Sequence, residues 1–251
     1  MILRGGALVL LLLLSCYYEC GAWALTTTVP LERRVVGRRA MAVLLTPALV
    51  PSVARGESVR SLVNAGMQAF QGNDVDRSLA LFDEAIRLSP SVKTRLWQRG
   101  LSLYYAGDYA AAAEQFESDV AENPNDTEES IWHFLSTAQL KGFDQATLLN
   151  VGVDPRPVMR TVYDLFQTGQ RDKLETLATS SAASTAFYAA LYLGLYAEAQ
   201  GDQTNSRRWL QAAVDNKLYA QSGDYMYALA KVHLKRRGDA PFGSSEELRR
   251  F

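Results

Sequence analysis

The sequence predicts an all-α protein, a right-handed solenoid of about nine to ten helices that follows a disordered N-terminal targeting leader. The first observation is a repeat: four pairs of marker residues recur at an offset of 34 residues, the length of one helical hairpin. The second is a series of turn-like glycines that continues this spacing, less regularly, through the rest of the chain. The third is that residues 1–54 have the composition of targeting segments and not of a fold.

The charges are almost balanced overall, with 26 lysines and arginines against 27 aspartates and glutamates in 251 residues. This balance argues against a nucleic-acid-binding protein, which normally carries a clear basic excess. The apolar content of 48% is ordinary for a globular protein. The charges are distributed unevenly, because residues 1–54 carry five arginines and only two glutamates. We therefore expect a basic leader ahead of a mildly acidic folded domain.

Residues 1–24 form the first predicted targeting segment, a secretory signal peptide. Arg4 precedes the apolar run 7–14, and residues 22–24 (Ala-Trp-Ala) follow as a small-x-small cleavage pattern. The apolar run is too short for a membrane-spanning helix, which needs about 20 apolar residues. We expect this segment to be removed, and the processed protein to have no stable membrane span.

Residues 25–54 form a second predicted targeting segment. The stretch 33–55 holds five arginines and no acidic residue, as in an organelle transit peptide. Within it, the twin arginines 38–39 precede the apolar run 41–50 and a further cleavage pattern, 52–54, which resembles a Tat export signal. Two export signals joined by a basic stretch resemble the tripartite leaders of thylakoid-lumen proteins in algae with secondary plastids. The resemblance implies a location in the thylakoid lumen of a plastid.

Two other interpretations of the leader stay open. One is a single secretion signal followed by a disordered linker. The other is a periplasmic lipoprotein that serves as an adaptor for envelope enzymes, because residues 13–16 (Leu-Leu-Ser-Cys) form a partial lipobox. The lipoprotein interpretation leaves the twin-arginine segment 38–54 unexplained.

Residues 55–126 contain two well-formed repeats, at roughly 58–91 and 93–125. The paired markers at the 34-residue offset are Leu62 and Leu96, Gly66 and Gly100, Phe82 and Phe116, and Pro90 and Pro124. These markers identify the units as tetratricopeptide repeats (TPR). We expect the small glycines to let the two helices of a hairpin approach closely, and the prolines to stop the second helix. Asn73 and Gly107 are expected at turns that need a left-handed backbone. Asp119 departs from the pattern, because a small residue is usual there.

The rest of the chain departs further from the repeat pattern. Residues 127–183 are predicted to form degenerate helical hairpins, with helices at 128–141, 157–168 and 171–180. A capping box of Asp126 and Glu129 would begin the first of these helices. Residues 184–238 are predicted to form a further TPR-like hairpin at 187–218 and a capping helix at 224–236 that covers the end of the stack. Residues 239–251 are a predicted flexible tail.

The residue types needed for catalysis are scarce, so we expect no enzyme, no cofactor and no metal. Cleavage of the leader would remove both cysteines, Cys16 and Cys20. The two histidines, His133 and His233, lie in different predicted helices and are expected to be packed helix residues. The sequence has no glycine-rich phosphate loop and no serine nucleophile elbow.

A protein partner is the expected ligand, bound as a peptide or helix in the concave TPR groove. The residues predicted to line this groove are Val63, Met67, Phe70, Trp97, Leu101 and Tyr104. They are apolar and aromatic, unlike the lysine and asparagine residues that clamp a C-terminal carboxylate in co-chaperones. They suit an apolar partner segment, since aromatic residues dominate binding hot spots. The alternative is that some of them, especially Phe70 and Tyr104, are buried by an adjacent helix.

Four segments resemble a family of plastid TPR proteins of plants and algae: 97–100, 125–132, 154–160 and 224–226. The resemblance implies a plastid helical-repeat protein and supplies no catalytic activity. Arg156 and Arg160, in the third segment, are a secondary surface candidate, or they pair with Asp126, Glu128 or Glu129. The sequence as a whole predicts a non-enzymatic scaffold that assists assembly or maintenance of photosynthetic complexes.

Overall fold

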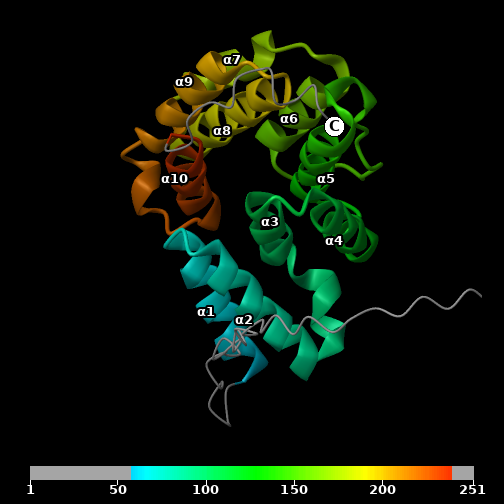
Figure 1. Cartoon of the computed structure of the whole chain (residues 1–251). Helices are drawn as coiled ribbons and strands as arrows, with labels where there is room; N and C mark the ends of the chain where they lie inside the picture. The colour runs from blue at the N-terminus through cyan, green and yellow to red at the C-terminus, as the bar shows by residue number, and fades with distance from the viewer. Residues whose placement is uncertain (1–57, 239–251) are drawn as a thin grey trace, which may run out of the picture. The chain divides into compact units, whose positions relative to one another are not determined.

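A computed structural model describes residues 58–238, and every regular element in that range is helical (Figure 1). The all-α prediction is confirmed for these residues. The helices are α1 (Val59–Gln71), α2 (Val75–Leu88), α3 (Trp97–Ala106), α4 (Tyr109–Glu122), α5 (Thr127–Lys141), α6 (Pro157–Thr168), α7 (Asp172–Ala178), α8 (Ala183–Ala199), α9 (Gln203–Val214) and α10 (Tyr225–Gly238). Short 3₁₀ helices occur at Pro90–Arg95, Phe143–Gln145 and Tyr219–Gln221. The predicted segments 1–24, 25–54 and 239–251 lie outside the described residues.

Three hairpins, α1–α2, α3–α4 and α8–α9, have the same turn. A residue with a left-handed backbone ends the first helix: Asn73 at φ 66°, Gly107 at φ 86° and Gly201 at φ 79°. An aspartate then caps the second helix, because each carboxylate accepts a hydrogen bond from a backbone N–H of the first turn. The three bonds are Asp74 to Arg77 at 3.2 Å, Asp108 to Ala111 at 3.1 Å and Asp202 to Asn205 at 3.0 Å. The predicted left-handed turns at Asn73 and Gly107 are confirmed.

The same three hairpins share a glycine at the point where their helices touch. A Cβ atom on Gly66 would lie 2.9 Å from the Phe82 ring, and one on Gly100 would lie 2.7 Å from the Phe116 ring. In α8, a Cβ on Gly194 would lie 2.6 Å from Leu210 Cγ. These separations are below any normal carbon–carbon contact, so a side chain at these positions would push the helices apart. The predicted close approach at Gly66 and Gly100 is therefore confirmed.

The prolines act as predicted. The second helix of the first hairpin ends at Leu88, and Pro90 begins a 3₁₀ turn. The second helix of the next hairpin ends at Glu122, two residues before Pro124. Proline cannot donate a backbone hydrogen bond and clashes with the preceding turn, so neither helix continues.

The middle helices match the prediction closely, with one correction. Helix α6 begins and ends as predicted, α5 begins one residue earlier, and α7 is shorter at both ends. Only the Asp126 half of the predicted capping box forms, and the prediction for Glu129 is wrong. The Asp126 carboxylate accepts from Glu128 N at 2.9 Å, whereas Asp126 N donates to the Asn123 carbonyl oxygen and not to Glu129. The Glu129 carboxylate is buried instead of capping the helix.

Helices α5 and α8 are the most buried long helices of the described range, and α8 has the more apolar sequence. Its sequence is apolar around the whole circumference, as expected for a helix that is covered on all sides. It contacts α5, α6, α7 and α9. No helix among residues 58–238 combines the length and apolarity that a membrane span requires.

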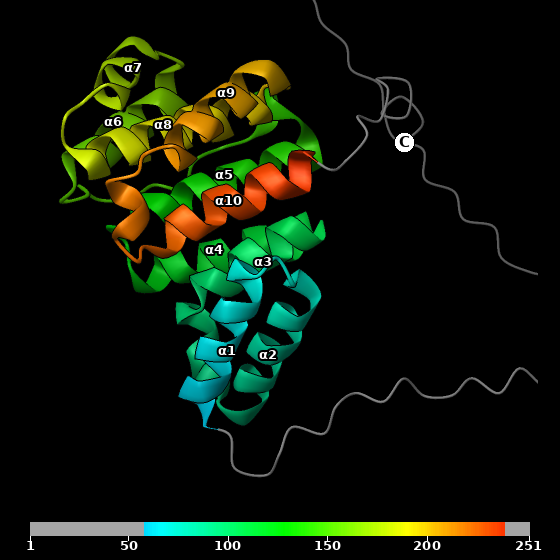
Figure 2. The same cartoon turned by 90° about the vertical axis from the view of Figure 1, so that its left-hand side faces the viewer.

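Helix α10 contacts the first hairpin as well as α9 (Figure 2). The Tyr225 ring stacks on Phe70 of α1, with ring centroids 5.5 Å apart, and meets Trp97 of α3 edge-on at 5.4 Å. Further along α10, Arg236 Nε donates to Asn73 Oδ1 at 2.8 Å. The sequence predicts only that this helix covers the end of the stack. It also packs against helices near the start of the described range.

Candidate functional site

The six predicted groove residues divide into two groups. Phe70, Leu101 and Tyr104 are fully buried. Tyr225 of α10 covers Phe70, and the Trp132 ring packs edge-on against Tyr104 at 5.2 Å. These three residues belong to the core, which corresponds to the alternative that the sequence left open.

Val63, Met67 and Trp97, the other three predicted groove residues, stay half-buried. They alone can offer surface to a partner. Trp97 also lines a small cavity beside α3, and this cavity is the candidate site.

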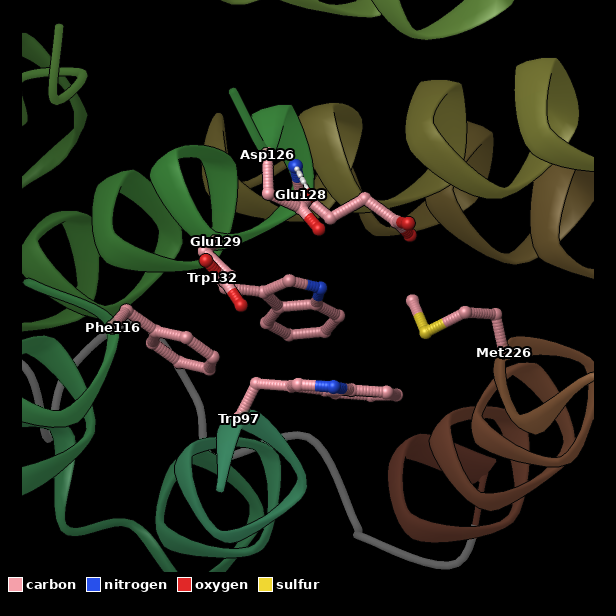
Figure 3. Close-up of a pocket in the computed structure, with 7 residues that line it drawn as sticks. All are labelled: Trp97, Phe116, Asp126, Glu128, Glu129, Trp132 and Met226. Atoms are coloured by element: carbon pink, nitrogen blue, oxygen red, sulfur yellow. Dashed lines mark hydrogen bonds between the residues drawn. The ribbon is translucent and has the colours of Figure 1, made fainter. Parts of the chain in front are cut away.

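The cavity lies where α3, α4, α5 and the start of α10 come together (Figure 3). Its volume is about 100 Å³. That is enough for the head of one side chain and well below the roughly 300–1,000 Å³ of small-molecule sites. The lining residues are Trp97, Phe116, Asp126, Glu128, Glu129, Trp132 and Met226.

Aromatic rings form two sides of the cavity. Trp132 lies over Trp97 in Figure 3, with Phe116 at one end and the Met226 thioether at the other. The Phe116 and Trp132 rings are stacked, with centroids 6.2 Å apart and an interplanar angle of 26°. Trp132 is only 2% exposed, yet its indole Nε1 has no hydrogen-bond partner within the described residues. A buried tryptophan N–H usually finds an acceptor, so this unpaired donor beside the cavity is unusual.

Carboxylates form the third side, and Glu129 is the unusual one. Its residue is 7% exposed, and its Oε2 has no hydrogen-bond partner in the part of the chain that the structure describes. Burial, together with the negative charges of Asp126, Asp119 and Glu128, raises the pKa of Glu129 to about 8. Burial likewise raises the pKa of Asp119, on the neighbouring helix, to about 7. Glu129 is therefore a buried carboxyl group of the cavity wall with no cation among residues 58–238, and Asp119, outside the lining, is a second buried carboxyl group nearby.

Glu128, next in sequence, is paired. Arg156 Nη1 contacts Glu128 Oε2 at 2.5 Å, and the Tyr192 hydroxyl donates to Glu128 Oε1 at 2.8 Å. The same guanidinium donates to Asp154 at 2.8 Å and lies 3.5 Å from Asp126. Arg156 thus compensates three carboxylates, and no side chain among residues 58–238 forms an ion pair with Glu129.

The second surface candidate, Arg160, makes a different contact. Its Nη1 donates to the backbone carbonyl of Asp154 at 2.7 Å. Arg156 therefore pairs with Glu128 and Asp126, as the sequence allowed, whereas Arg160 supports the backbone of the loop before α6. Neither arginine lines the cavity.

The two histidines lie apart, as predicted, in α5 and α10. His133 Nδ1 is 3.2 Å from the Thr147 carbonyl oxygen. His233 is fully buried, and its Nδ1 is 2.8 Å from the Tyr105 hydroxyl. Both act in packing and hydrogen bonding between elements.

Trp97 is the one residue that the sequence predicted for binding and that also lines the cavity. The sequence predicts Phe116 as a repeat marker and Glu129 as a helix cap, and it does not predict that both residues line the cavity. One local pattern in the sequence does point to this site. The acidic residues Asp126, Glu128 and Glu129 come within two helical turns before Trp132. No protein-family model matches the chain. The geometry of the hairpins and of the cavity therefore carries the functional inference.

Proposed function

We propose that this chain is a TPR-type helical-repeat scaffold that binds another protein and has no catalytic activity of its own. The observation that carries the proposal is the shared geometry of the three hairpins, in which a left-handed turn, an aspartate cap and a contact glycine recur. Repeats of one hairpin geometry stack side by side and present an extended surface for binding. A peptide or helix of the partner would lie along this surface.

The proposed contact surface is the part of the predicted groove that α10 leaves accessible. It comprises Val63 and Met67 on α1 and Trp97 on α3, with the cavity beside Trp97. Tryptophan is enriched among the residues that carry most of the binding energy at protein interfaces. We therefore place the centre of the interface at Trp97.

Affinity capture from extracts of the native host tests the binding role. The purified wild-type chain is compared with Trp97→Ala and Met67→Ala, which truncate half-buried side chains on the proposed surface. Leu218→Ala is the matched control, because Leu218 is 79% exposed and lies outside the proposed surface. We expect one or more proteins to be recovered with the wild type and the control and lost with Trp97→Ala. Equal recovery with all folded variants would contradict the proposed surface.

The proposed address is the thylakoid lumen, where the scaffold would assist assembly or maintenance of photosynthetic complexes. The support is the double targeting pattern of residues 1–54, with its twin arginines at 38–39. A fluorescent protein fused to residues 1–60 is expected to reach plastids and their lumen. Cytosolic or purely secreted fluorescence would contradict the address. A mature N-terminus that begins at a lipid-modified Cys16, measured by intact mass, would favour the periplasmic lipoprotein instead.

A further inference from the structure

We propose that the cavity between α3, α4, α5 and α10 receives an arginine side chain of the partner protein. The inference rests on the proposed function, because the arginine is carried by the protein that the scaffold binds. It adds the chemistry by which that partner is recognised. Three features of the cavity lead to it: a carboxylate without a cation among the described residues, flat aromatic walls, and an unpaired donor and an unpaired acceptor on two of the residues that line it.

The first feature is the charge of the wall. Glu129 is buried in the wall, Asp126 and Glu128 lie near it, and Asp119, which is buried outside the lining, adds to the negative charge. Arg156 contacts Asp126, Glu128 and Asp154 but is not among the groups that compensate Glu129. A buried carboxylate without a hydrogen-bonded cation is strongly disfavoured, so this wall either binds a proton or receives a positive charge from outside. A cationic ligand supplies the charge that residues 58–238 do not place beside Glu129.

The second feature is the shape and chemistry of the other walls. Trp97 and Trp132 present indole rings to the cavity, and Phe116 closes one end (Figure 3). Aromatic faces attract cations, and indole does so most strongly. A guanidinium is planar and weakly hydrated and stacks on aromatic rings, whereas an ammonium is a compact and strongly hydrated point charge. Flat walls around a small volume therefore favour arginine over lysine.

The third feature is the pair of unsatisfied groups. Glu129 Oε2 is a hydrogen-bond acceptor and Trp132 Nε1 is a donor, and neither atom has a hydrogen-bond partner within the described residues. A guanidinium offers donors for the Glu129 carboxylate, and the backbone of the same peptide offers carbonyl acceptors for an indole N–H. An amino-acid residue within a peptide offers both groups, whereas a metal ion offers no acceptor for the indole. The walls also suit a metal poorly, because hard cations take six or more oxygen ligands and this cavity offers rings and a thioether.

A peptide titration tests the proposal directly. The purified chain is titrated with acetyl-Gly-Arg-Gly-amide and with the same peptide carrying lysine or citrulline, the neutral counterpart of arginine. Binding is followed by calorimetry and by tryptophan fluorescence, since two of the four tryptophans line the cavity. We expect the arginine peptide to bind at least about tenfold more tightly than either other peptide, because only it has a planar cation. Equal binding of the citrulline peptide, or no binding of the arginine peptide, would overturn the proposal.

Two variants locate the binding. Glu129→Gln removes the charge with almost no change of shape and is expected to weaken binding of the arginine peptide by at least about tenfold. Glu117→Gln is the matched control, because Glu117 is an exposed glutamate on the same helix as Phe116 and lies outside the cavity. Circular dichroism confirms that both variants fold. Unchanged binding by folded Glu129→Gln would also overturn the proposal.

The peptide titration and the affinity capture together distinguish failure of the arginine site from failure of the proposed scaffold function. Loss of a captured protein with Trp97→Ala, without any affinity for the arginine peptide, would support the scaffold and refute the arginine site. Specific binding of the arginine peptide, without any protein that depends on Trp97, would support the cavity as an arginine site and refute the scaffold. Failure of both experiments refutes both proposals.

Discussion

Glu129 and Trp132 line the same small cavity, and neither Glu129 Oε2 nor Trp132 Nε1 has a hydrogen-bond partner among the described residues. One is an acceptor and the other a donor, and the two residues are three positions apart on α5. Side chains at this spacing lie on the same face of a helix, so the pair is a consequence of the local sequence. The cavity forms because α3, α4 and α10 bring Trp97, Phe116 and Met226 to that face.

The stability of the chain should depend on pH through Glu129. Its folded pKa of about 8 lies above the ordinary value of about 4.3, so the folded state retains a proton that the unfolded state loses. This contribution is complete below the ordinary pKa and is lost as pH rises through about 8. Urea unfolding at about pH 6 and about pH 9 measures how much stability each protein loses between the two pH values. This loss should be smaller for Glu129→Gln than for the wild type, by on the order of 2 kcal/mol. Glu117→Gln should follow the wild type, and parallel behaviour of all three proteins would refute the account of Glu129.

His233 should contribute a pH dependence of stability with the opposite sign. Burial lowers its pKa, although Glu198 acts in the other direction. The folded state therefore resists a proton that the unfolded state accepts, and stability is lost as pH falls below about 6.5. The slope of unfolding free energy against pH below that value should be smaller for His233→Leu than for wild type. An equal slope in both proteins would show that His233 is not the titrating group.

Removal of the Arg156 guanidinium should lower the stability of the folded chain. Its removal leaves Asp154, whose side chain is 1% exposed, and the mostly buried Glu128 without their cation. Arg156→Met should lower the free energy of unfolding by about 3 kcal/mol. Arg160→Met is the comparison, because Arg160 donates to a backbone carbonyl, and about 1 kcal/mol is expected. Denaturant unfolding measures both, and equal losses would contradict the assigned pairing.

Gly100 should not tolerate a side chain. An added methyl group would lie 2.7 Å from the Phe116 ring, inside a hairpin that is closely packed. Gly100→Ala should destabilise by about 1–3 kcal/mol, and combination with Phe116→Leu should recover part of the loss. Gly238→Ala, at a position with open space around it, should have little effect. Additive losses in the Gly100 and Phe116 double variant would argue against this contact.

The parts of the fold that follow local rules could be predicted from the sequence. The turns at Asn73 and Gly107 need a left-handed backbone, and the contact glycines recur with the repeat, so both leave a periodic signal. The stacking of Tyr225 on Phe70 leaves none, because the two residues are far apart in sequence and belong to helices that share no repeat position. This contact buries part of the predicted groove.

The candidate site could be predicted only in part for the same reason. The sequence predicts a binding role for Trp97, because an aromatic residue at a repeat position on a first helix suggests a binding surface. It predicts a helix cap at Glu129, because an acidic residue three positions after Asp126 usually has that role. Its burial depends on packing by neighbouring helices, which a local motif does not encode.

The most direct test of the central claim is photo-crosslinking from position 97 in the native host or its organelle extract. Trp97 is replaced by p-benzoylphenylalanine, which keeps an aromatic side chain at the edge of the cavity, and a second protein carries the same group at Leu218 as the control. The account predicts crosslinks from position 97 to another protein, at peptides that contain arginine, and none of these from position 218. Crosslinks from position 97 that stay within the chain, or that match those from position 218, would contradict it.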